Sequence, residues 1–294
     1  MSHVAGEIAS QPQVWSQAAQ LAATAQSRSA MPRPGERVAV VGCGTSWFMA
    51  QSAAVLREQA GQGDTDAFAA SQFPTDRRYD RVVAITRSGT TTEVLDLLRR
   101  LGTDQPSTVV TTEAGHPVVP LAGESVLLGF ADEQSVVQTR FATSVLAWWR
   151  AALGEDLAPA IRDAEAELAA PLPDDLLKRT QFSFLGDGWT VGLANEAALK
   201  LREAAQAWTE SYPAMEFRHG PISIVDERSA VWVFGDVPDG LADDVAATGA
   251  LLVHSGGDPM AHLTTAQRLA VGLAEAAGKN PDTPRHLTRS VVLQ

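Results

Sequence analysis

Two short segments combine glycines with hydroxyl side chains directly after an apolar run. The first, GCGTS at residues 42–46, follows VAVV, and the second, RSGTTT at residues 87–92, follows RVVAIT. Glycines allow close backbone approach, and the amides and hydroxyls at a helix start bind anions. We therefore expect one phosphorylated ligand to be held from two sides. The expected phosphate-binding residues are Gly44, Thr45, Ser46, Thr86, Arg87, Ser88, Gly89 and Thr91.

Other interpretations of these two segments have to be weighed. Glycine, serine and threonine also form turns and helix caps, and for either segment alone that alternative stays open. Neither segment is a P-loop, because no Gly-Lys-Ser/Thr follows, and neither has the G-x-G-x-x-G dinucleotide pattern. Arg87 could add a bidentate cation to an anion site. Cys43, which has no histidine nearby in sequence, is expected to be a small buried residue without a catalytic part.

A second group of residues could move protons. Glu196, Lys200 and Glu203 follow one another at i, i+4 and i+7, so a helix would place them on one face. The ordinary interpretation is a solvated stripe of ion pairs. The functional interpretation makes one carboxylate a general base, with the lysine stabilising charge beside it.

The segment EFRHGP, residues 216–221, places His219 on a sharply turned loop. Imidazole titrates near neutral pH, so this side chain could donate or accept a proton, although a loop histidine often has no such role. The other histidines show no metal-ligand spacing with an acidic cluster. We expect no metal site and assign no cofactor.

Composition limits the class of protein. The 294 residues are 45% apolar and 20% charged, which allows a sizeable core. The formal net charge of −12 argues against nucleic acid or an anionic membrane as the main partner. One cysteine, no signal-like start and no apolar run of membrane-spanning length favour a cytoplasmic protein.

The apolar patterns predict strands that alternate with helices. Such alternation is typical of a parallel sheet covered on both faces, and therefore of an α/β fold. The predicted strands are 36–42, 81–86, 107–113, 124–130, 181–189, 229–235 and 249–257. Seven helices are predicted. They are one from residue 11, one over about 46–58, one over 92–101, one from near 135, one that includes 161–170, one from the turn after 186 to about 208, and one that includes 264–278.

The chain is expected to divide into three parts. Residues 1–33 form a helical segment, 34–170 a first domain that binds the phosphorylated ligand, and 171–294 a second domain. The Pro-Leu-Pro of residues 171–173 marks the boundary. Both halves share the order strand, glycine turn, helix, strand. The second half lacks a loop like RSGTTT, so the phosphate site is assigned to the first.

Several motifs together resemble one family. In order they are GCGTSWF, TRSGTTTEVLDLL, FLGDGWTVGLANEAALKLREAA, EFRHGP and PRHLTRSVVL; EIASQPQVW and EQSVVQTRFATSVLAWW add to the match. The chain thus resembles the sugar isomerase (SIS) family, and within it the isomerase half of the glucosamine-6-phosphate synthases. The resemblance covers nearly all of the chain, and it implies two tandem doubly wound SIS domains.

The resemblance also implies roles for individual residues. Glu203 matches the general base that moves a proton between C1 and C2, Lys200 the lysine beside it, and His219 the histidine of ring opening. In the family the neighbouring subunit supplies this histidine, which implies a homodimer. The implied partner is a phosphorylated sugar, with no nucleic acid and no membrane. Val136, Gln138 and Glu196 are the further residues expected to contact the substrate.

Three positions depart from the family pattern. Arg289 stands where the family has the lysine that forms an imine, and a guanidinium stays protonated and cannot form one. It could still stabilise an oxyanion, and it is kept among the expected catalytic residues. Arg87 replaces a glutamine at the phosphate. Gln138 replaces a small hydroxyl residue, which leaves the identity of the sugar open.

The expected activity is that of a sugar-phosphate isomerase or amino-sugar-phosphate deaminase/isomerase. The hexosamine 6-phosphate and fructose 6-phosphate pair is favoured. The sequence shows no counterpart of the family's glutamine-hydrolysing domain. We therefore expect deamination, or isomerisation without nitrogen transfer. The alternative is a non-catalytic regulatory protein that binds a sugar phosphate, which the substitutions at Arg289 and Gln138 favour.

Overall fold

The computed structural model describes residues 2–293 and divides the chain into two compact units. The N-terminal unit comprises Gln13–Glu133, Arg140–Leu157 and the chain from Thr288 onward. The C-terminal unit comprises the chain up to Pro12, Gln134–Thr139 and Ala158–Leu287. The units are therefore discontinuous in sequence, whereas the predicted ranges 1–33, 34–170 and 171–294 were continuous. The start of the chain packs with the later sheet, and its last residues pack with the earlier one.

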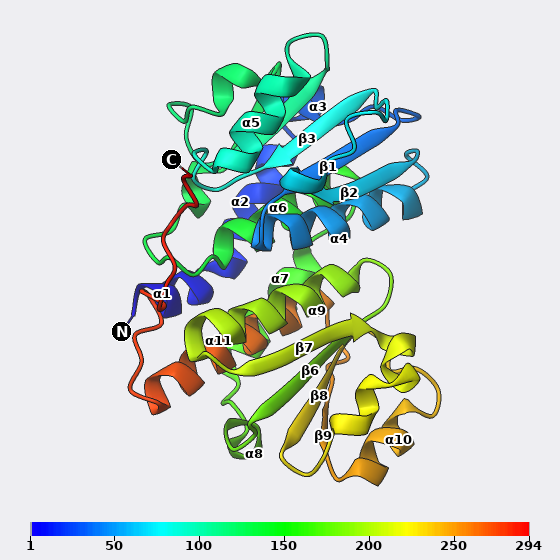
Figure 1. Ribbon diagram of the computed structural model, residues 1–294, viewed down its shortest axis with the longest axis vertical. Coiled ribbons are helices and arrows are strands. Elements are labelled where there is room, and N and C mark those ends of the chain that lie inside the picture. The colour runs from blue at the N-terminus through cyan, green and yellow to red at the C-terminus, as the bar shows by residue number, and fades with distance from the viewer. Residues whose placement is uncertain (1, 294) are drawn as a thin grey trace. The chain divides into compact units, whose positions relative to one another are not determined.

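The N-terminal unit is built on a five-stranded sheet in the order β2-β1-β3-β4-β5, with every pair parallel. In β1, β3 and β4 every residue is buried, because helices cover both faces. In Figure 1, α5 lies on one face of this sheet, and α4 with α6 on the other. The strands are β1 (Val38–Gly42), β2 (Thr65–Ala69), β3 (Arg81–Ile85), β4 (Ser107–Thr111) and β5 (Glu124–Leu127). The helices are α2 (Gln11–Ala22, from Gln13 on), α3 (Ala25–Ala30), α4 (Thr45–Gln59), α5 (Thr92–Leu101) and α6 (Arg140–Ala152), with short 3₁₀ turns η1 (Ala70–Gln72), η2 (Val119–Leu121) and η3 (Gly129–Ala131).

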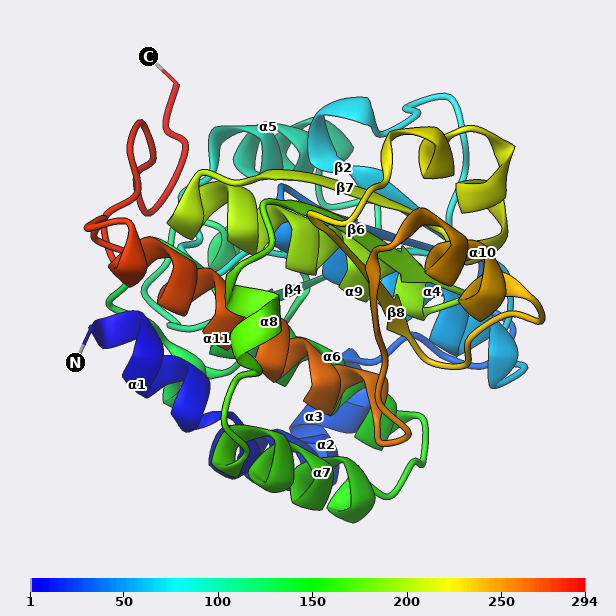
Figure 2. The ribbon, with the colours of Figure 1, turned by 90° about the horizontal axis from the view of Figure 1, so that it is seen from below.

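The C-terminal unit has a four-stranded parallel sheet in the order β7-β6-β8-β9. Helices α9 and α11 lie on one face and α10 on the other (Figure 1). Figure 2 shows α1 from the start of the chain beside α11, which begins about 250 residues later, with α7 and α8 also against α11. The strands are β6 (Gln181–Gly186), β7 (Trp208–Pro213), β8 (Ser229–Phe234) and β9 (Leu251–Val253). The helices and turns are α1 (His3–Ala9), α7 (Ala158–Ala169), α8 (Asp174–Leu177), α9 (Thr190–Lys200), η4 (Leu201–Ala205), η5 (Ala214–His219), η6 (Pro221–Ile224), α10 (Leu241–Thr248) and α11 (Pro259–Ala276).

Each sheet has an apolar core on its two faces. In the N-terminal unit, the apolar side of α5 packs on alternate residues of β1, β3 and β4. In the C-terminal unit, Leu241 and Val245 of α10 pack against one face of the sheet. On the other face an aromatic row is closed by His262 of α11; the row is Phe182, Phe184, Trp232 and Phe234. Helix propensity alone does not hold these helices; burial of their apolar faces does.

The predicted α/β class with parallel sheets flanked by helices is confirmed. All seven predicted strands are present, and the helix predicted over 92–101 has those bounds. Two strands were not predicted, β2 and β7. The helix expected near residue 135 begins at Arg140, and the one expected to reach about residue 208 ends its α-helical part at Lys200. Within residues 2–293 no helix is long and apolar enough to cross a membrane.

Candidate functional site: two loops of one unit and a buried ion cluster of the other

The two glycine-and-hydroxyl loops lie at one edge of the N-terminal sheet. They follow β1 and β3, which are neighbouring parallel strands, so their carboxyl ends meet at the same edge. The chain passes from β1 to β2 on one side and to β3 on the other, which makes this the point where the strand order reverses. Open α/β sheets bind ligands at that point. The structure thus brings together both halves of the predicted phosphate site.

Three glycines shape these loops. A Cβ on Gly42 would lie 2.5 Å from the backbone carbon of Ser46, so the end of β1 packs directly on the first turn of α4. Gly44 has φ +53° and Gly89 has φ +63°, a backbone region that side chains rarely adopt. A Cβ on Gly89 would also collide with His116. The loops need glycine for their conformation as well as for any ligand.

Arg87, predicted as a bidentate cation for an anion, is buried and already paired with a carboxylate. Its side chain is 3% exposed, and its Nη1 lies 3.3 Å from Oε2 of Glu133, which is fully buried. Its carbonyl oxygen accepts hydrogen bonds from the hydroxyls of Thr111 and Thr112, at 3.3 and 3.1 Å. Removing either partner of such a buried pair leaves a buried charge, which is costly. Arg87 therefore has a structural role in addition to any role toward an anion.

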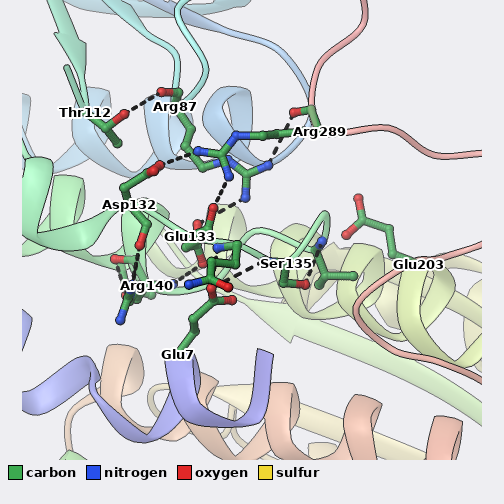
Figure 3. Close-up of polar contacts among 12 residues, drawn as sticks. Glu7, Arg87, Thr112, Asp132, Glu133, Ser135, Arg140, Glu203 and Arg289 are labelled. Atoms are coloured by element: carbon green, nitrogen blue, oxygen red, sulfur yellow. Dashed lines mark hydrogen bonds and ion pairs between the residues drawn. The ribbon is translucent and has the colours of Figure 1, made fainter. Parts of the chain in front are cut away.

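Arg289 lies in the same unit, on the C-terminal tail (Figure 3). Its guanidinium donates to the carbonyl of Glu133 and pairs with the carboxylate of Asp132. Its own carbonyl accepts a hydrogen bond from Nη2 of Arg87 at 3.3 Å. Arg140, the first residue of α6, donates its backbone N–H to Oε1 of Glu133 at 2.8 Å. Glu133 thus links α6, Arg87 and the tail.

In the C-terminal unit, Glu196, Lys200 and Glu203 form one buried cluster. The Lys200 Nζ lies 2.5 Å from Oε2 of Glu203 and 3.5 Å from Oε1 of Glu196. Lys200 is 1% exposed and Glu196 is fully buried, while Glu203 is 18% exposed. The solvated-stripe interpretation is therefore wrong. A buried ion pair contributes little net stability, because desolvation of the charges offsets their attraction.

Glu203 lies on a π-helical turn, which the sequence analysis did not predict. Helix α9 ends at Lys200, and η4 (Leu201–Ala205) continues it with π-helical hydrogen bonding. Gln206 then ends the turn with φ +57°, a left-handed conformation that is rare for a non-glycine residue. Single π turns occur often at functional sites because they re-aim a side chain. Figure 3 labels Glu203 with its carboxylate extended from this turn.

Glu203 also lines a pocket of about 360 Å³. The other lining residues are Leu199, Arg202, Gln206, Ala207, Arg285, His286 and Leu287, all from the C-terminal unit. Of the three members of the cluster, only Glu203 reaches this pocket. A carboxylate held by an ammonium and open to a pocket with two guanidiniums can accept a proton from an anionic substrate.

The remaining predicted residues of the C-terminal unit lie elsewhere. His219 is exposed at the end of η5, and among the residues that the structure describes it makes no ion pair with Glu203. Val136 donates its N–H to the carbonyl of Asp282 at 3.0 Å. Gln138 is half-buried, and its Oε1 has no hydrogen-bond partner within the described part of the chain. Among the described residues, none of these three lines the pocket of Glu203.

The Cys43 thiol in the first loop is not activated as a nucleophile. Burial, with a contribution from Glu93, raises the pKa of the Cys43 thiol to about 11, so the thiol stays protonated at neutral pH. Over residues 2–293 no group of three or more histidine, cysteine and acidic side chains could hold a metal ion.

Sequence comparison finds glutamine–fructose-6-phosphate aminotransferases (isomerizing) among the relatives. The glutamine–fructose-6-phosphate aminotransferase (isomerizing) of Sulfolobus acidocaldarius is 27% identical over 298 residues, covering 88% of this chain and 50% of that protein. That of Thermus thermophilus is 26% identical over 323 residues, covering 90% of this chain and 53% of that protein. The chain spans about half the length of the curated relatives it matches. No protein-family model matches the chain.

Solved structures give the same result at the level of the fold. Glucosamine-6-phosphate deaminase from Thermotoga maritima superposes with a TM-score of 0.81 at 21% identity, covering 99% of this chain and all of that one. The C-terminal domain of glucosamine-fructose-6-phosphate aminotransferase from Francisella tularensis gives 0.80 at 19% identity, covering 96% and 98%. The resemblance to the sugar isomerase (SIS) family is confirmed. The SIS fold thus accounts for the α/β plan and its parallel sheets.

Several residues of the site escaped the sequence analysis. Asp132, Glu133 and Ser290 contact the tail or the second loop, but they lie far from it in sequence, and no local pattern marks such partners. Arg202 and Arg285 line the pocket of Glu203. The available signal was that Glu133, Arg202, Arg285 and Ser290 lie within the motifs quoted for the family resemblance, although none of them was given a role.

Proposed function

We propose that the chain is a sugar-phosphate isomerase or amino-sugar-phosphate deaminase/isomerase that acts on a hexose or hexosamine 6-phosphate. The observation that carries the proposal is the burial of Lys200 between two carboxylates, with only Glu203 open to a pocket. The names of the relatives and of the structural neighbours support it. Each of the two sheets with its helices is, in this proposal, one SIS-type domain.

The proposed reaction divides the work between two groups of residues. The loops after β1 and β3 bind the 6-phosphate through backbone amides and hydroxyls. Glu203 removes the proton from C2 of the open-chain aldose, and the electron pair forms the C1–C2 double bond as the C1 carbonyl electrons move to O1. A proton passes through solvent from the O–H or N–H on C2 to O1, so that C2 ends as a carbonyl or an imine once C1 is protonated. Lys200 offsets the negative charge that develops, and Glu203 returns the proton to C1. With an amino group at C2 the product is an imine, which water hydrolyses to the ketose and ammonia.

Arg289 has no imine-forming role in this proposal. Its guanidinium pairs with Asp132 and stays protonated. Reactions that need a covalent imine with the ketose therefore fall outside the proposed activity. Isomerisation needs only proton transfers, which the Glu203 cluster can supply, and deamination adds the hydrolysis of an imine by water.

His219 opens the sugar ring in the proposed mechanism, from the neighbouring subunit of a homodimer. The exposed side chains of His219, Met215 and Ile224 support this part of the proposal, because the two apolar ones would be buried by a partner. A mixture of inactive Glu203→Gln and His219→Asn chains tests it. If His219 acts across the dimer, half of a refolded equal mixture is heterodimer with one intact site, which gives about a quarter of wild-type activity. No recovery would place His219 in its own subunit's site or outside the site.

The activity itself is tested with glucosamine 6-phosphate, by assaying ammonia and fructose 6-phosphate together. The proposal expects both products in equal amounts, or isomerisation of a hexose 6-phosphate without ammonia. Turnover should be lost in Glu203→Gln and kept in Glu165→Gln, an exposed carboxylate on α7. Tight binding without turnover across a panel of sugar phosphates would instead establish a regulatory binding protein.

A further inference from the structure

The tail that follows Leu287 places a hydroxyl inside the second loop. The Ser290 Oγ accepts hydrogen bonds from Ser88 Oγ at 3.1 Å and from Thr90 Oγ1 at 3.0 Å. It also lies 3.4 Å from Thr91 Oγ1. Three loop hydroxyls thus converge on one oxygen, and two of them donate to it. An oxygen of a bound phosphoryl group would be held in the same way.

The backbone of the tail takes a further donor of the same loop. The N–H of Thr92, the first residue of α5, donates to the carbonyl of Val291 at 3.1 Å. The N–H of Leu293 in turn donates to Oγ1 of Thr92 at 2.9 Å. The first amides of a helix have no partner within the helix and are the usual donors to an anion. At α5 one of them is already bound to the chain's own tail.

Charged residues hold the tail at this place. Arg289 pairs with Asp132, and the carbonyl of Arg289 accepts from Arg87, whose other guanidinium nitrogen pairs with Glu133 (Figure 3). Both cations near the second loop are therefore matched by carboxylates. The loop hydroxyls, the Thr92 amide and Arg87, which are the donors expected to bind a phosphate, are therefore already bound to other groups of the chain.

Little else fixes the tail. Val291, Val292 and Leu293 are 53%, 64% and 62% exposed, so the tail buries little apolar surface. Its position depends mainly on the polar contacts of Arg289, Ser290 and Val291. A ligand that offers several charged oxygens to the same donors can compete with it, because charge-assisted hydrogen bonds are stronger than neutral ones.

We propose that residues 288–293 are an intramolecular competitor of the phosphorylated ligand, with Ser290 at the position of a phosphate oxygen and Arg289 as the latch on Asp132. The inference rests on the proposed phosphate site. A tail that occupies the loop nine-tenths of the time weakens the apparent affinity about tenfold, because only the open fraction binds. This gives a role to Arg289, which replaces the family's lysine: its guanidinium binds the carboxylate of Asp132 and the carbonyl of Glu133 at the same time.

The first experiment measures binding of inorganic phosphate by titration calorimetry, which needs no turnover. A chain that ends after Leu287 should bind phosphate about tenfold more tightly than the full chain. Asp132→Asn, which weakens the latch outside the loop, should change the affinity in the same direction. Asp96→Asn removes a similar carboxylate from an exposed ion pair with Arg99 and should have no effect. Equal or weaker binding by the shortened chain overturns the inference.

The second experiment is trypsin cleavage between Arg289 and Ser290, followed by mass spectrometry. If phosphate displaces the tail, added phosphate accelerates this cleavage. If the tail instead closes over the bound ligand, phosphate slows it, and the inference is wrong. Phosphate binding with release of the tail, but without turnover of any sugar phosphate, would retain the inference and contradict the proposed activity. Absence of phosphate binding in every variant would overturn the inference.

Discussion

The two units use the same local plan for different purposes. In each, a strand ends in a glycine that packs on the first turn of a helix: Gly42 on Ser46 in one, Gly186 on Thr190 in the other. In the C-terminal unit the Thr190 hydroxyl is used within the turn, since it accepts from Asp187 N–H at 2.8 Å and donates to the carbonyl of Phe234 at 2.8 Å. In the N-terminal unit the second loop directs three hydroxyls at a single oxygen.

In the proposed function, this difference separates binding from chemistry. In the C-terminal unit the Thr190 hydroxyl is used within the chain, and the polar cluster lies at the far end of the helix, at Lys200 and η4. Where hydroxyls are directed outward, an external oxygen can be bound. Both sets of hydroxyls have partners within the chain, but those partners differ. Thr190 is bound inside its own turn, whereas the loop after β3 is bound by Ser290 of the tail, which in the proposal above a phosphate displaces.

The largest expected effect concerns the chemistry of the C-terminal unit. Glu203→Gln keeps the shape of the side chain but removes the base, so we expect kcat to fall by about 10³-fold. Because the phosphate is bound elsewhere in this account, KM should change by less than about threefold. Steady-state kinetics with the active sugar phosphate measures both, and Glu165→Gln serves as the control. A large rise in KM with unchanged kcat would assign Glu203 to binding.

A second prediction uses a buried histidine of the C-terminal unit. Burial lowers the pKa of His262 from 6.5 to about 4; Glu167 opposes this shift and His254 adds to it. Its neutral ring accepts a hydrogen bond from Trp232 Nε1 at Nδ1, at 3.2 Å. Between pH 6.5 and 4, the His262 imidazole is protonated in the unfolded chain but stays neutral in the folded one. The free energy of unfolding should therefore fall by up to about 3 kcal/mol over this range.

The control for this titration is His262→Asn, which keeps an acceptor for the Trp232 indole and cannot be protonated. Denaturant unfolding followed at several pH values from 7 to 4 measures the difference between the two proteins. Between pH 6.5 and 4 the free energy of unfolding of the wild-type protein should fall more than that of the variant. The fall that remains in the variant is the contribution of its carboxylates. Parallel pH profiles would show that His262 is not the group responsible.

A third prediction tests whether the two glycines are equivalent. Gly42→Ala and Gly186→Ala each place a methyl group against the backbone of the following helix, so each should destabilise the protein by about 1–3 kcal/mol. Gly6→Ala in α1 meets no atom within 4 Å and should leave stability unchanged or slightly raised. The midpoints of denaturant unfolding compare the three. If Gly186→Ala does not lower the free energy of unfolding, the close packing of strand on helix is not required in the C-terminal unit, and the two glycines are not equivalent.

The fold was largely predictable from the sequence, and the two missed strands show why. Both β2 and β7 are edge strands. Most residues of β2 are only partly buried, and β7 starts with the exposed Trp208. The prediction relied on continuous apolar runs, which arise where a strand is covered on both faces and has neighbours on both sides. The other two edge strands, β5 and β9, were predicted because their sequences contain the valine and leucine runs VL and LLV. The sequences of β2 (TDAFA) and β7 (WTESYP) contain no valine, leucine or isoleucine.

The site was predictable only where its residues are local. The two loops follow from glycines and hydroxyls next to strands, a pattern of adjacent positions. The ion pair of Arg87 with Glu133 joins residues 46 apart, and the contact of Ser88 with Ser290 joins residues 202 apart. Helical spacing predicted that Lys200 and Glu203 would meet. It could not predict that Lys200 is buried, because burial depends on what packs over the helix.

The account assigns phosphate binding to the N-terminal unit and proton transfer to the C-terminal unit. The most direct test measures the affinity for fructose 6-phosphate by titration calorimetry in the wild-type protein, in Ser88→Ala and in Glu203→Gln. Loss of one hydroxyl donor to a charged oxygen should weaken binding about tenfold in Ser88→Ala. Glu203→Gln should bind within about twofold of wild type, because the carboxylate acts in the reaction and not on the phosphate. Unchanged affinity in Ser88→Ala, or a larger loss in Glu203→Gln than in Ser88→Ala, would contradict the account.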